Sequence, residues 1–305
     1  YSDCWVDDAR LVVLNALDAK RHSADIQTHT RCTGAERKKG IWHITLEDTN
    51  NTQTRTIQAK TLVNAAGPWV DDLLDQTGLK QSDKANVRLV RGSHVIVPKL
   101  YEHDRSYIFQ NADGRIIFAI PYEHDFTLLG TTDADHKTSL DSVEISEDET
   151  QYICDAANTY FKQSIKRRDV VWTYAGVRPL YNDGATAAQE ATRNYVLKVR
   201  DKDGKAPLLN IFGGKITTYR CLAEDALEKL SAYLPAHDAA WTEQPPLPGG
   251  DFAQSDVLQQ IKRLQTDYTF IDDDWAGSLI RRYGTRAWEM LGETRTRSDL
   301  GQHFG

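Results

Sequence analysis

The chain has 305 residues, of which 40% are hydrophobic and 27% charged, a composition that excludes a disordered or collagen-like chain. Its 37 basic and 44 acidic residues give a net charge of -7, so the positive field that nucleic-acid binding favours is not expected over the whole surface. No apolar run approaches the ~20 residues that a membrane-spanning helix needs. We therefore expect a folded chain of about two domains that binds no nucleic acid and spans no bilayer.

Helix and strand alternate in the N-terminal part of the chain. Apolar spacing predicts a helix over residues 8–22, followed by strands at 41–46 and 61–66. The second strand ends in the small residues Ala66 and Gly67, and a proline then begins a short helix. Small residues at a strand end permit close packing against a ligand ring or another backbone. A plain packing turn explains them equally well.

The pattern then changes to closely spaced strands separated by short polar turns. These strands are expected at 93–97, 107–110, 115–120 and 127–130. The turn Asn-Ala-Asp-Gly at 111–114 carries the strongest hairpin signal, so an antiparallel meander is expected. Ser146 and Glu149 form a capping box that predicts a helix of about twenty residues.

The C-terminal half begins with a strand at 170–177 that is followed by Arg178 and a proline. A hairpin is expected to pair 195–199 with 208–212, and a helix should run from there to about residue 234. A proline-rich linker at 243–250 then precedes a polar helical segment.

The turn between the hairpin and the helix is the most informative local signal. Gly213 and Gly214 connect a strand to a helix N-terminus, so backbone N–H groups there can approach a ligand closely. The helix dipole adds roughly half a positive charge at the same place. The competing interpretation is an ordinary tight turn.

Three side chains are candidates for binding or proton transfer. Arg178, held extended by the following proline, can bind a phosphate or carboxylate through two parallel hydrogen bonds, and Lys215 can add a charge to the same anion. His94, in an apolar strand, can accept a proton from a hydroxyl. A surface ion pair for Arg178 and a buried structural role for His94 are the competing interpretations.

The four cysteines carry no metal signature. They lie far apart, without a C-x-x-C pair or a histidine at zinc-ligand spacing. We therefore expect no metal site, and thiols rather than disulfides, as in a reducing compartment. The four are Cys4, Cys32, Cys154 and Cys221.

Taken together, five segments strongly resemble the FAD-dependent aerobic glycerol-3-phosphate dehydrogenases. Each is only moderately specific, but their combination and order are specific, and the resemblance covers the whole chain. The segments are NAAGPW at 64–69, RGSH at 91–94, LGTTD at 129–133, WTYAGVRP at 172–179 and FGGKITTYR at 212–220.

The resemblance implies a mixed α/β (α+β) fold in interleaved parts. Residues 1–80 and 180–234 would form a partial Rossmann-like FAD domain, and 81–179 an antiparallel-sheet substrate domain. Residues 235–305 would be a linker and a truncated helical C-terminal region.

The resemblance also implies a reaction, which is oxidation of sn-glycerol 3-phosphate to dihydroxyacetone phosphate with hydride transfer to FAD and electrons passed to quinone. By motif match, His94 and Arg178 would be catalytic, and Arg178, Lys215 and, more weakly, Arg193 would bind substrate. The residues expected along the flavin are Ala66, Gly67, Gly213, Gly214, Thr217 and Thr218. The implied location is cytoplasmic, peripherally attached to the inner face of the cell membrane, and a homodimer is compatible with the family.

One departure from the family concerns the start of the chain. The first residue is Tyr1, the only methionine is Met290, and no G-x-G-x-x-G cradle for a dinucleotide phosphate is present. We therefore expect an internal fragment that binds FAD weakly or is inactive; a mature secreted protein starting at Tyr1 is the alternative. Two other functions remain open, namely another amine-oxidase-like FAD oxidase and a non-catalytic anion-binding domain.

Overall fold

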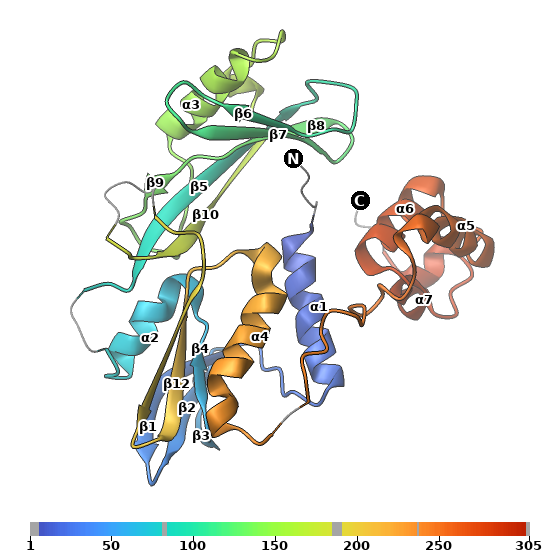
Figure 1. Cartoon of the computed structure of the whole chain (residues 1–305). Coiled ribbons are helices and arrows are strands. Elements are labelled where there is room, and N and C mark those ends of the chain that lie inside the picture. The colour runs from blue at the N-terminus through green and yellow to red at the C-terminus, as the bar shows by residue number, and fades with distance from the viewer. Residues whose placement is uncertain (1–5, 81–83, 185–190, 237, 303–305) are drawn as a thin grey trace. The chain divides into compact units, whose positions relative to one another are not determined.

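The computed structural model describes residues 6–80, 84–184, 191–236 and 238–302 (Figure 1). The chain divides into two compact units, one formed by Thr30–His237 and the other by Tyr1–His29 together with Asp238–Gly305. Within the described ranges, no helix has the length and apolar character needed to cross a membrane. The division into four parts predicted from the family resemblance stays a prediction.

The larger unit contains two small sheets that share a hydrophobic core. The first is antiparallel and consists of β1 (Thr30–Lys38), β2 (Ile41–Asp48) and β3 (Thr54–Ala59). The second has the order β11 (Val196–Lys202), β12 (Lys205–Phe212), β4 (Leu62–Asn64). Trp42 of β2 is fully buried in the core between them, and its indole Nε1 donates a hydrogen bond to Pro207 O at 2.9 Å. The predicted strand at 41–46 and the predicted hairpin are therefore confirmed.

The third sheet of the larger unit has six strands, and all of its pairings are antiparallel. Its strands are β10 (Trp172–Tyr181), β5 (Val87–Pro98), β8 (Phe126–Gly130), β7 (Ile116–Tyr122) and β6 (Tyr107–Gln110), in that order, with β9 (Ala134–Asp135) paired to β5. The expected antiparallel sheet is confirmed, with one difference from a simple meander: β5 lies between β8 and β10 rather than beside β6.

One face of this sheet packs against α3 (Glu147–Asn158), as Figure 1 shows. Val95, Ala119 and Leu129 from three neighbouring strands pack there against Ile153 and Ala157 of the helix, and all five are fully buried. The predicted capping box of Ser146 and Glu149 is confirmed. Because side chains alternate between the faces of a strand, the neighbours of these core residues point to the other face.

Two element lengths differ from the sequence-based prediction. The helix α3 has 12 residues rather than about twenty, because Asn158 accepts from Ile165 N and donates to Ile165 O and so turns the chain back. Strand β10 continues through Arg178 and Pro179, so Arg178 lies within the strand and not at its end. Proline is tolerated there because β10 is an edge strand of its sheet.

The remaining helical elements of the larger unit follow its strands. The 3₁₀ turn η1 (Gly67–Trp69) leads into α2 (Val70–Gln76), and η3 (Ile216–Thr218) leads into α4 (Tyr219–Leu230). Further short turns are η2 (Arg167–Asp169) and η4 (Ser231–Tyr233).

The smaller unit is helical, as predicted for residues 8–22 and for the C-terminal segment. Its helices are α1 (Asp8–Arg21), α5 (Val257–Asp267), α6 (Asp273–Tyr283) and α7 (Arg286–Leu291), with the turns η5 (Gln254–Asp256) and η6 (Arg297–Leu300). Leu264, Ile280 and Leu291 are among the buried residues that join α5, α6 and α7. Arg10 connects α1 to α6, because its Nε donates to Arg282 O at 3.0 Å.

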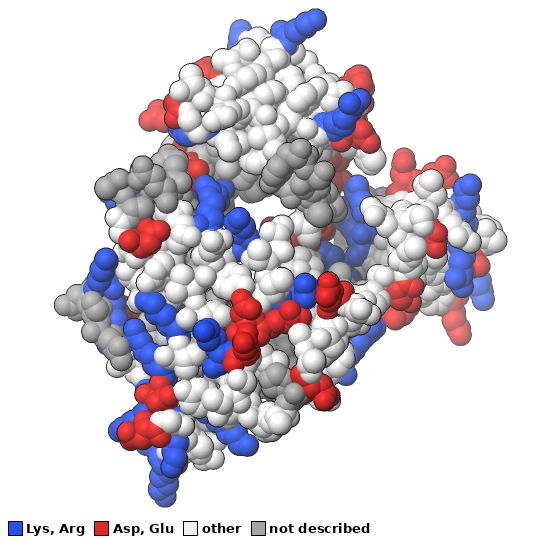
Figure 2. Space-filling model, in the orientation of Figure 1, with Lys and Arg blue, Asp and Glu red and all other residues white. Residues whose placement is uncertain are grey.

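The charged and thiol side chains of the described residues are distributed as follows. Acidic and basic side chains are interspersed over the face drawn in Figure 2. Cys32, Cys154 and Cys221 are free, and Cys4 lies outside the described residues. Among the residues that the structure describes, no group of three His, Cys, Asp or Glu side chains is placed to hold a metal ion.

Candidate active site

Two glycine turns leave the same edge of the mixed sheet. Strands β4 and β12 are parallel, with Asn64 opposite Asn210, so their carboxyl ends meet at one edge. The first strand is followed there by Ala66 and Gly67, and the second by Gly213 and Gly214. The three glycines have φ values of +56°, +71° and +103°, a region that glycine adopts without steric cost.

The turn at Gly213 also lies against the six-stranded sheet. A Cβ built on Gly213 would be 3.0 Å from Asn194 O and 3.4 Å from Tyr181 N at the end of β10. The turn η1, which contains Gly67, contacts β10 as well. Strand β10 therefore links both glycine turns to the sheet that carries His94 and Arg178.

His94 lies in a slot formed by the strands on either side of it. In the pairing register its neighbours are Gly130 on β8 and Tyr174 on β10. The imidazole stacks on the Tyr174 ring, with 4.8 Å between centroids and 12° between planes. On the other side a Cβ at Gly130 would lie 2.3 Å from His94 Cδ2, so only glycine leaves room for the ring in this position.

The surroundings of His94 favour its neutral form. Burial, and then the positive charge of Arg178, lower the pKa of His94 from 6.5 to about 4. Its Nδ1 is buried and has no hydrogen-bond partner among the described residues. A buried polar atom without a protein partner is a place where a ligand atom can bind. His94 is therefore placed to accept a proton at neutral pH.

Arg178 lies beside His94 and is held by the segment that follows β8. Its Nη1 donates to Asp133 Oδ1 at 3.2 Å and its Nη2 to Thr131 Oγ1 at 3.0 Å. The guanidinium occupies the space over Gly92, where a Cβ would lie 2.2 Å from Nη1. Burial lowers the pKa of Arg178 from its ordinary value, and the carboxylate of Asp133 opposes that effect.

A second arginine shares the same carboxylate. Arg193 Nη2 lies 3.2 Å from Asp133 Oδ2, so one aspartate pairs with two guanidinium groups. The Asp133 side chain is only 14% exposed, whereas Arg193 is 41% exposed. Two positive charges against one negative charge leave a net positive cluster, which suits an anion such as a phosphate.

The structure thus brings together some of the residues predicted from sequence. His94, Arg178 and Arg193 form one cluster, and Ala66, Gly67, Gly213 and Gly214 lie at one sheet edge joined to it by β10. Lys215 and Thr217 are exposed, and Thr218 Oγ1 donates to Lys215 O at 3.0 Å. Lys215 forms no ion pair with a residue in the described ranges, so its predicted role in substrate binding stays a prediction.

Four residues of this cluster received no role from the sequence. They are Gly92, Gly130, Asp133 and Tyr174. The signal that could have found three of them is strand register, because Gly130 and Tyr174 lie opposite His94 and Gly92 lies two residues before it. Asp133 belongs to the segment LGTTD at 129–133, but nothing in the local sequence indicates which residues it pairs with.

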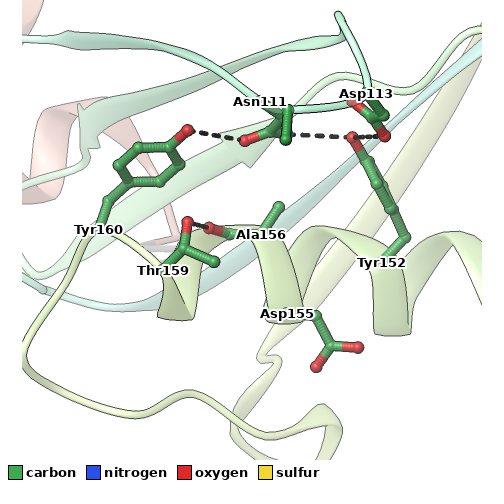
Figure 3. Close-up of a pocket in the computed structure, with 8 residues that line it drawn as sticks. Asn111, Asp113, Tyr152, Asp155, Ala156, Thr159 and Tyr160 are labelled. Carbon is green, nitrogen blue, oxygen red and sulfur yellow. Dashed lines mark hydrogen bonds between the residues drawn. The ribbon is translucent and has the colours of Figure 1, made fainter.

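A separate hollow lies beside α3, on the face of the sheet away from His94. Its volume is about 550 Å³, and Figure 3 shows it between the turn at Asn111 and the side chains of α3. Its polar groups bond to one another: Tyr160 donates to Asn111 Oδ1 at 3.0 Å, and Tyr152 donates to Asp113 Oδ2 at 3.2 Å. Its lining residues include neither a histidine nor a basic side chain, so we place the site at His94 and Arg178.

Comparison with known proteins identifies the family of this chain. A family described as "FAD dependent oxidoreductase" matches residues 1–220. A glycerol-3-phosphate dehydrogenase of Pseudomonas aeruginosa is 47% identical over 305 residues, which is 100% of this chain and 59% of the relative. A D-erythritol 1-phosphate dehydrogenase of Brucella abortus is 42% identical, over 100% of this chain and 60% of the relative.

A solved structure shares the fold. The glycerol-3-phosphate dehydrogenase of Bacillus halodurans, in complex with FAD, superposes with a TM-score of 0.77 at 27% identity, covering 94% of this chain and 55% of that one. The chain therefore spans about 60% of the length of the curated relatives it matches. Because the family match covers most of its residues, including both glycine turns and the cluster around His94, this chain belongs to the FAD dependent oxidoreductase family.

Proposed function

We propose that the complete protein containing this chain oxidises sn-glycerol 3-phosphate to dihydroxyacetone phosphate with FAD as its cofactor. The observation that carries the proposal is a partly buried histidine, whose pKa is lowered to about 4, beside two arginines that share one aspartate. A phosphate at one end of a small alcohol, and a hydroxyl on the carbon next to the one that bears it, match those two features. The names of the relatives support the same substrate.

The residues at the sheet edge fit a flavin. Gly67 has a positive φ, and a Cβ built on it would have no atom within 4 Å, so a flat ring can approach the backbone there. The turn at Gly213 and Gly214 precedes η3 and α4, whose N-terminus favours negative charge. When bound, FAD supplies the acceptor for the hydride from carbon 2 of the substrate.

The chain's own residues bind the substrate and accept its proton. Arg178 and Arg193 bind the phosphate, and Lys215 adds a third positive charge to the substrate or to a developing oxyanion. His94 takes the proton of the carbon 2 hydroxyl as the carbonyl forms. Its lowered pKa keeps the base form populated at pH 7.

The electron acceptor and the location complete the proposal. Electrons would pass to quinone in a protein attached peripherally to the inner, cytoplasmic face of the cell membrane. A homodimer is the proposed assembly. These three points are supported by the family resemblance rather than by a contact in the structure.

The function is tested with the complete protein, purified and kept anaerobic. We expect the visible flavin spectrum to bleach on addition of glycerol 3-phosphate and to stay unchanged with glycerol or sarcosine. D-erythritol 1-phosphate is the informative comparison, because one relative bears that substrate's name. Bleaching by erythritol 1-phosphate alone would assign a longer polyol phosphate, and bleaching by neither phosphate ester would make the proposal wrong.

A substitution at Gly92 tests whether the position of Arg178 matters for phosphate binding. In Gly92→Ala the new methyl group displaces the guanidinium, which is the flexible end of a side chain, so the fold should tolerate it. We expect KM for glycerol 3-phosphate to rise about tenfold, the equivalent of ~1.4 kcal/mol. Steady-state kinetics on the complete protein measure it.

The matched control is Gly176→Ala. Gly176 pairs with Gly92 across the two strands, and a Cβ there would have no atom within 4 Å. KM should stay within a factor of ~2 of the wild-type value, the scatter of a neutral surface substitution. Equal KM values for the two variants would remove Arg178 from the phosphate site.

A further inference from the structure

A largely buried carboxylate lies on the opposite face of the sheet from His94. Glu149, in the first turn of α3, is 11% exposed, and both of its oxygens accept hydrogen bonds. Oε2 accepts from Ser146 N at 3.0 Å and from Arg91 Nη2 at 2.6 Å. Oε1 accepts from Thr132 Oγ1 at 2.7 Å and from Ser93 Oγ at 3.0 Å.

These contacts exceed what a helix cap needs. A capping box uses the bonds to Ser146 alone. Ser93 and Thr132 belong to the sheet and to the segment after β8, and both are almost fully buried. Burial raises the pKa of Glu149, but the hydrogen bonds from Ser146, Thr132 and Arg91 outweigh it and lower the value to about 2. The carboxylate is therefore ionised and holds three elements together.

The contacts of Thr132 lead directly to the proposed phosphate site. Its hydroxyl donates to Glu149 and accepts from Ser93 N at 3.1 Å, so the side chain is fixed from two sides. Arg178 Nη1 donates to Thr132 O at 3.4 Å and to Asp133 Oδ1, and Arg178 Nη2 donates to Thr131 Oγ1. Anchoring the middle residue of this segment therefore fixes the three groups that hold Arg178.

Glu149 and Thr132 also contact β5, the strand that carries His94, the proposed proton acceptor. Ser93 immediately precedes His94, and its backbone N–H and its hydroxyl bond to Thr132 and to Glu149 respectively. Successive side chains of a strand point to opposite faces, so Ser93 reaches Glu149 while His94 faces the site.

We propose that Glu149 and Thr132 are positioning residues, which hold the segment 131–133 from behind the sheet so that Arg178 is preorganised for an anionic phosphate. This inference rests on the proposed function for the identity of the phosphate ester. It adds two residues that do not contact the substrate themselves and that affect phosphate binding through the position of Arg178.

The test uses the complete protein and two substitutions of one residue. Thr132→Val replaces the hydroxyl by a methyl group of similar size, and Thr132→Ser keeps the hydroxyl. For the valine variant we expect binding of inorganic phosphate, measured by calorimetry, to weaken about tenfold, with a similar rise in KM for glycerol 3-phosphate and kcat within a factor of ~3. The serine variant should restore both values.

A purely structural role has a different signature. It would lower Tm of the valine variant and leave phosphate affinity and KM at the wild-type values, and that result would overturn the proposal. If the valine variant does not fold, Glu149→Gln takes its place, with Glu147→Gln as the control, because Glu147 lies on the same helix and its side chain is 83% exposed. Glu149→Gln should weaken phosphate binding and Glu147→Gln should not; equal affinities would overturn the proposal.

The two readouts separate this inference from the function on which it rests. If the wild-type protein binds phosphate but does not oxidise glycerol 3-phosphate, the proposed function fails, and the calorimetric comparison of valine with serine still decides the positioning role. If the wild-type protein oxidises the substrate and both variants bind phosphate alike, only the positioning role fails.

Discussion

Replacing His94 by alanine is expected to lower kcat about 100-fold or more, the range typical for loss of a general base. The expectation follows from position, because the ring is fixed between Tyr174 and Gly130 and its buried Nδ1 has no partner among the described residues. Stopped-flow reduction of the flavin by glycerol 3-phosphate measures the step directly. His94→Gln, which keeps a polar side chain, should lose nearly as much because an amide does not take up a proton.

His136 provides the control for this substitution. It is a buried histidine of the larger unit, and its Nε2 lies 3.2 Å from Ser139 O. We expect His136→Gln to lower Tm and to leave the rate of flavin reduction within a factor of ~2, as for a site outside the chemistry. A wild-type rate in His94→Ala would show that another group accepts the proton.

The pKa of His94 gives this prediction a pH dependence. Because its pKa in the folded protein is lowered to about 4, the base form predominates above that pH, and the acid limb of kcat/KM should lie below pH 6.5. As pH falls from about 6.5 to 4, the unfolded chain takes up the proton before the folded one, so stability is lost in that window. His94→Gln should flatten the stability profile there, which thermal unfolding at several pH values measures.

The sequence predicts those elements of the fold that carry a local signal. The capping box at Ser146, the turn at Gly213 and the closely spaced strands of the six-stranded sheet are all confirmed. Strands β1 and β3 were not predicted, because their polar sequences, TRCTGAERK and TRTIQA, show no apolar alternation. They are strands because they pair with β2, whose Trp42 and Ile44 are buried.

The site shows the same limit. His94 and Arg178 could be named from residue type and motif, but their meeting depends on β5 lying between β8 and β10. The strand order depends on which strands pair in the folded chain, and the local hydrophobic periodicity does not predict it. The roles of Gly92 and Gly130 follow from this strand order. Gly92 leaves room for the side chain of Arg178 on β10, and Gly130 leaves room for the ring of His94 on β5. The role of Asp133 is visible only in the folded structure, where Arg178 and Arg193 both pair with its carboxylate.

Replacing Arg178 by alanine is expected to raise KM for glycerol 3-phosphate about 100-fold, because charge-assisted hydrogen bonds to an anion are each worth ~1.5–3 kcal/mol. The loss should exceed that in Gly92→Ala, where the guanidinium is moved but still present. Arg178→Lys should recover only part of the affinity, since an ammonium is a point charge without the planar fork. Removal of Arg178 also leaves Asp133 with Arg193 alone, so the cluster loses its net positive charge.

Arg88 is the matched control for this prediction. It forms a comparable pair in the same sheet, with its Nε 2.6 Å and its Nη2 2.8 Å from the two oxygens of Asp135. Arg88→Ala should leave KM within a factor of ~2, because a partly exposed ion pair outside the site contributes little. A second comparison uses a substrate without the phosphate: the wild type and Arg178→Ala should oxidise glycerol equally poorly. If Arg178→Ala and Arg88→Ala changed KM for glycerol 3-phosphate alike, the phosphate would have to bind elsewhere, and Lys215 would be the next residue to replace.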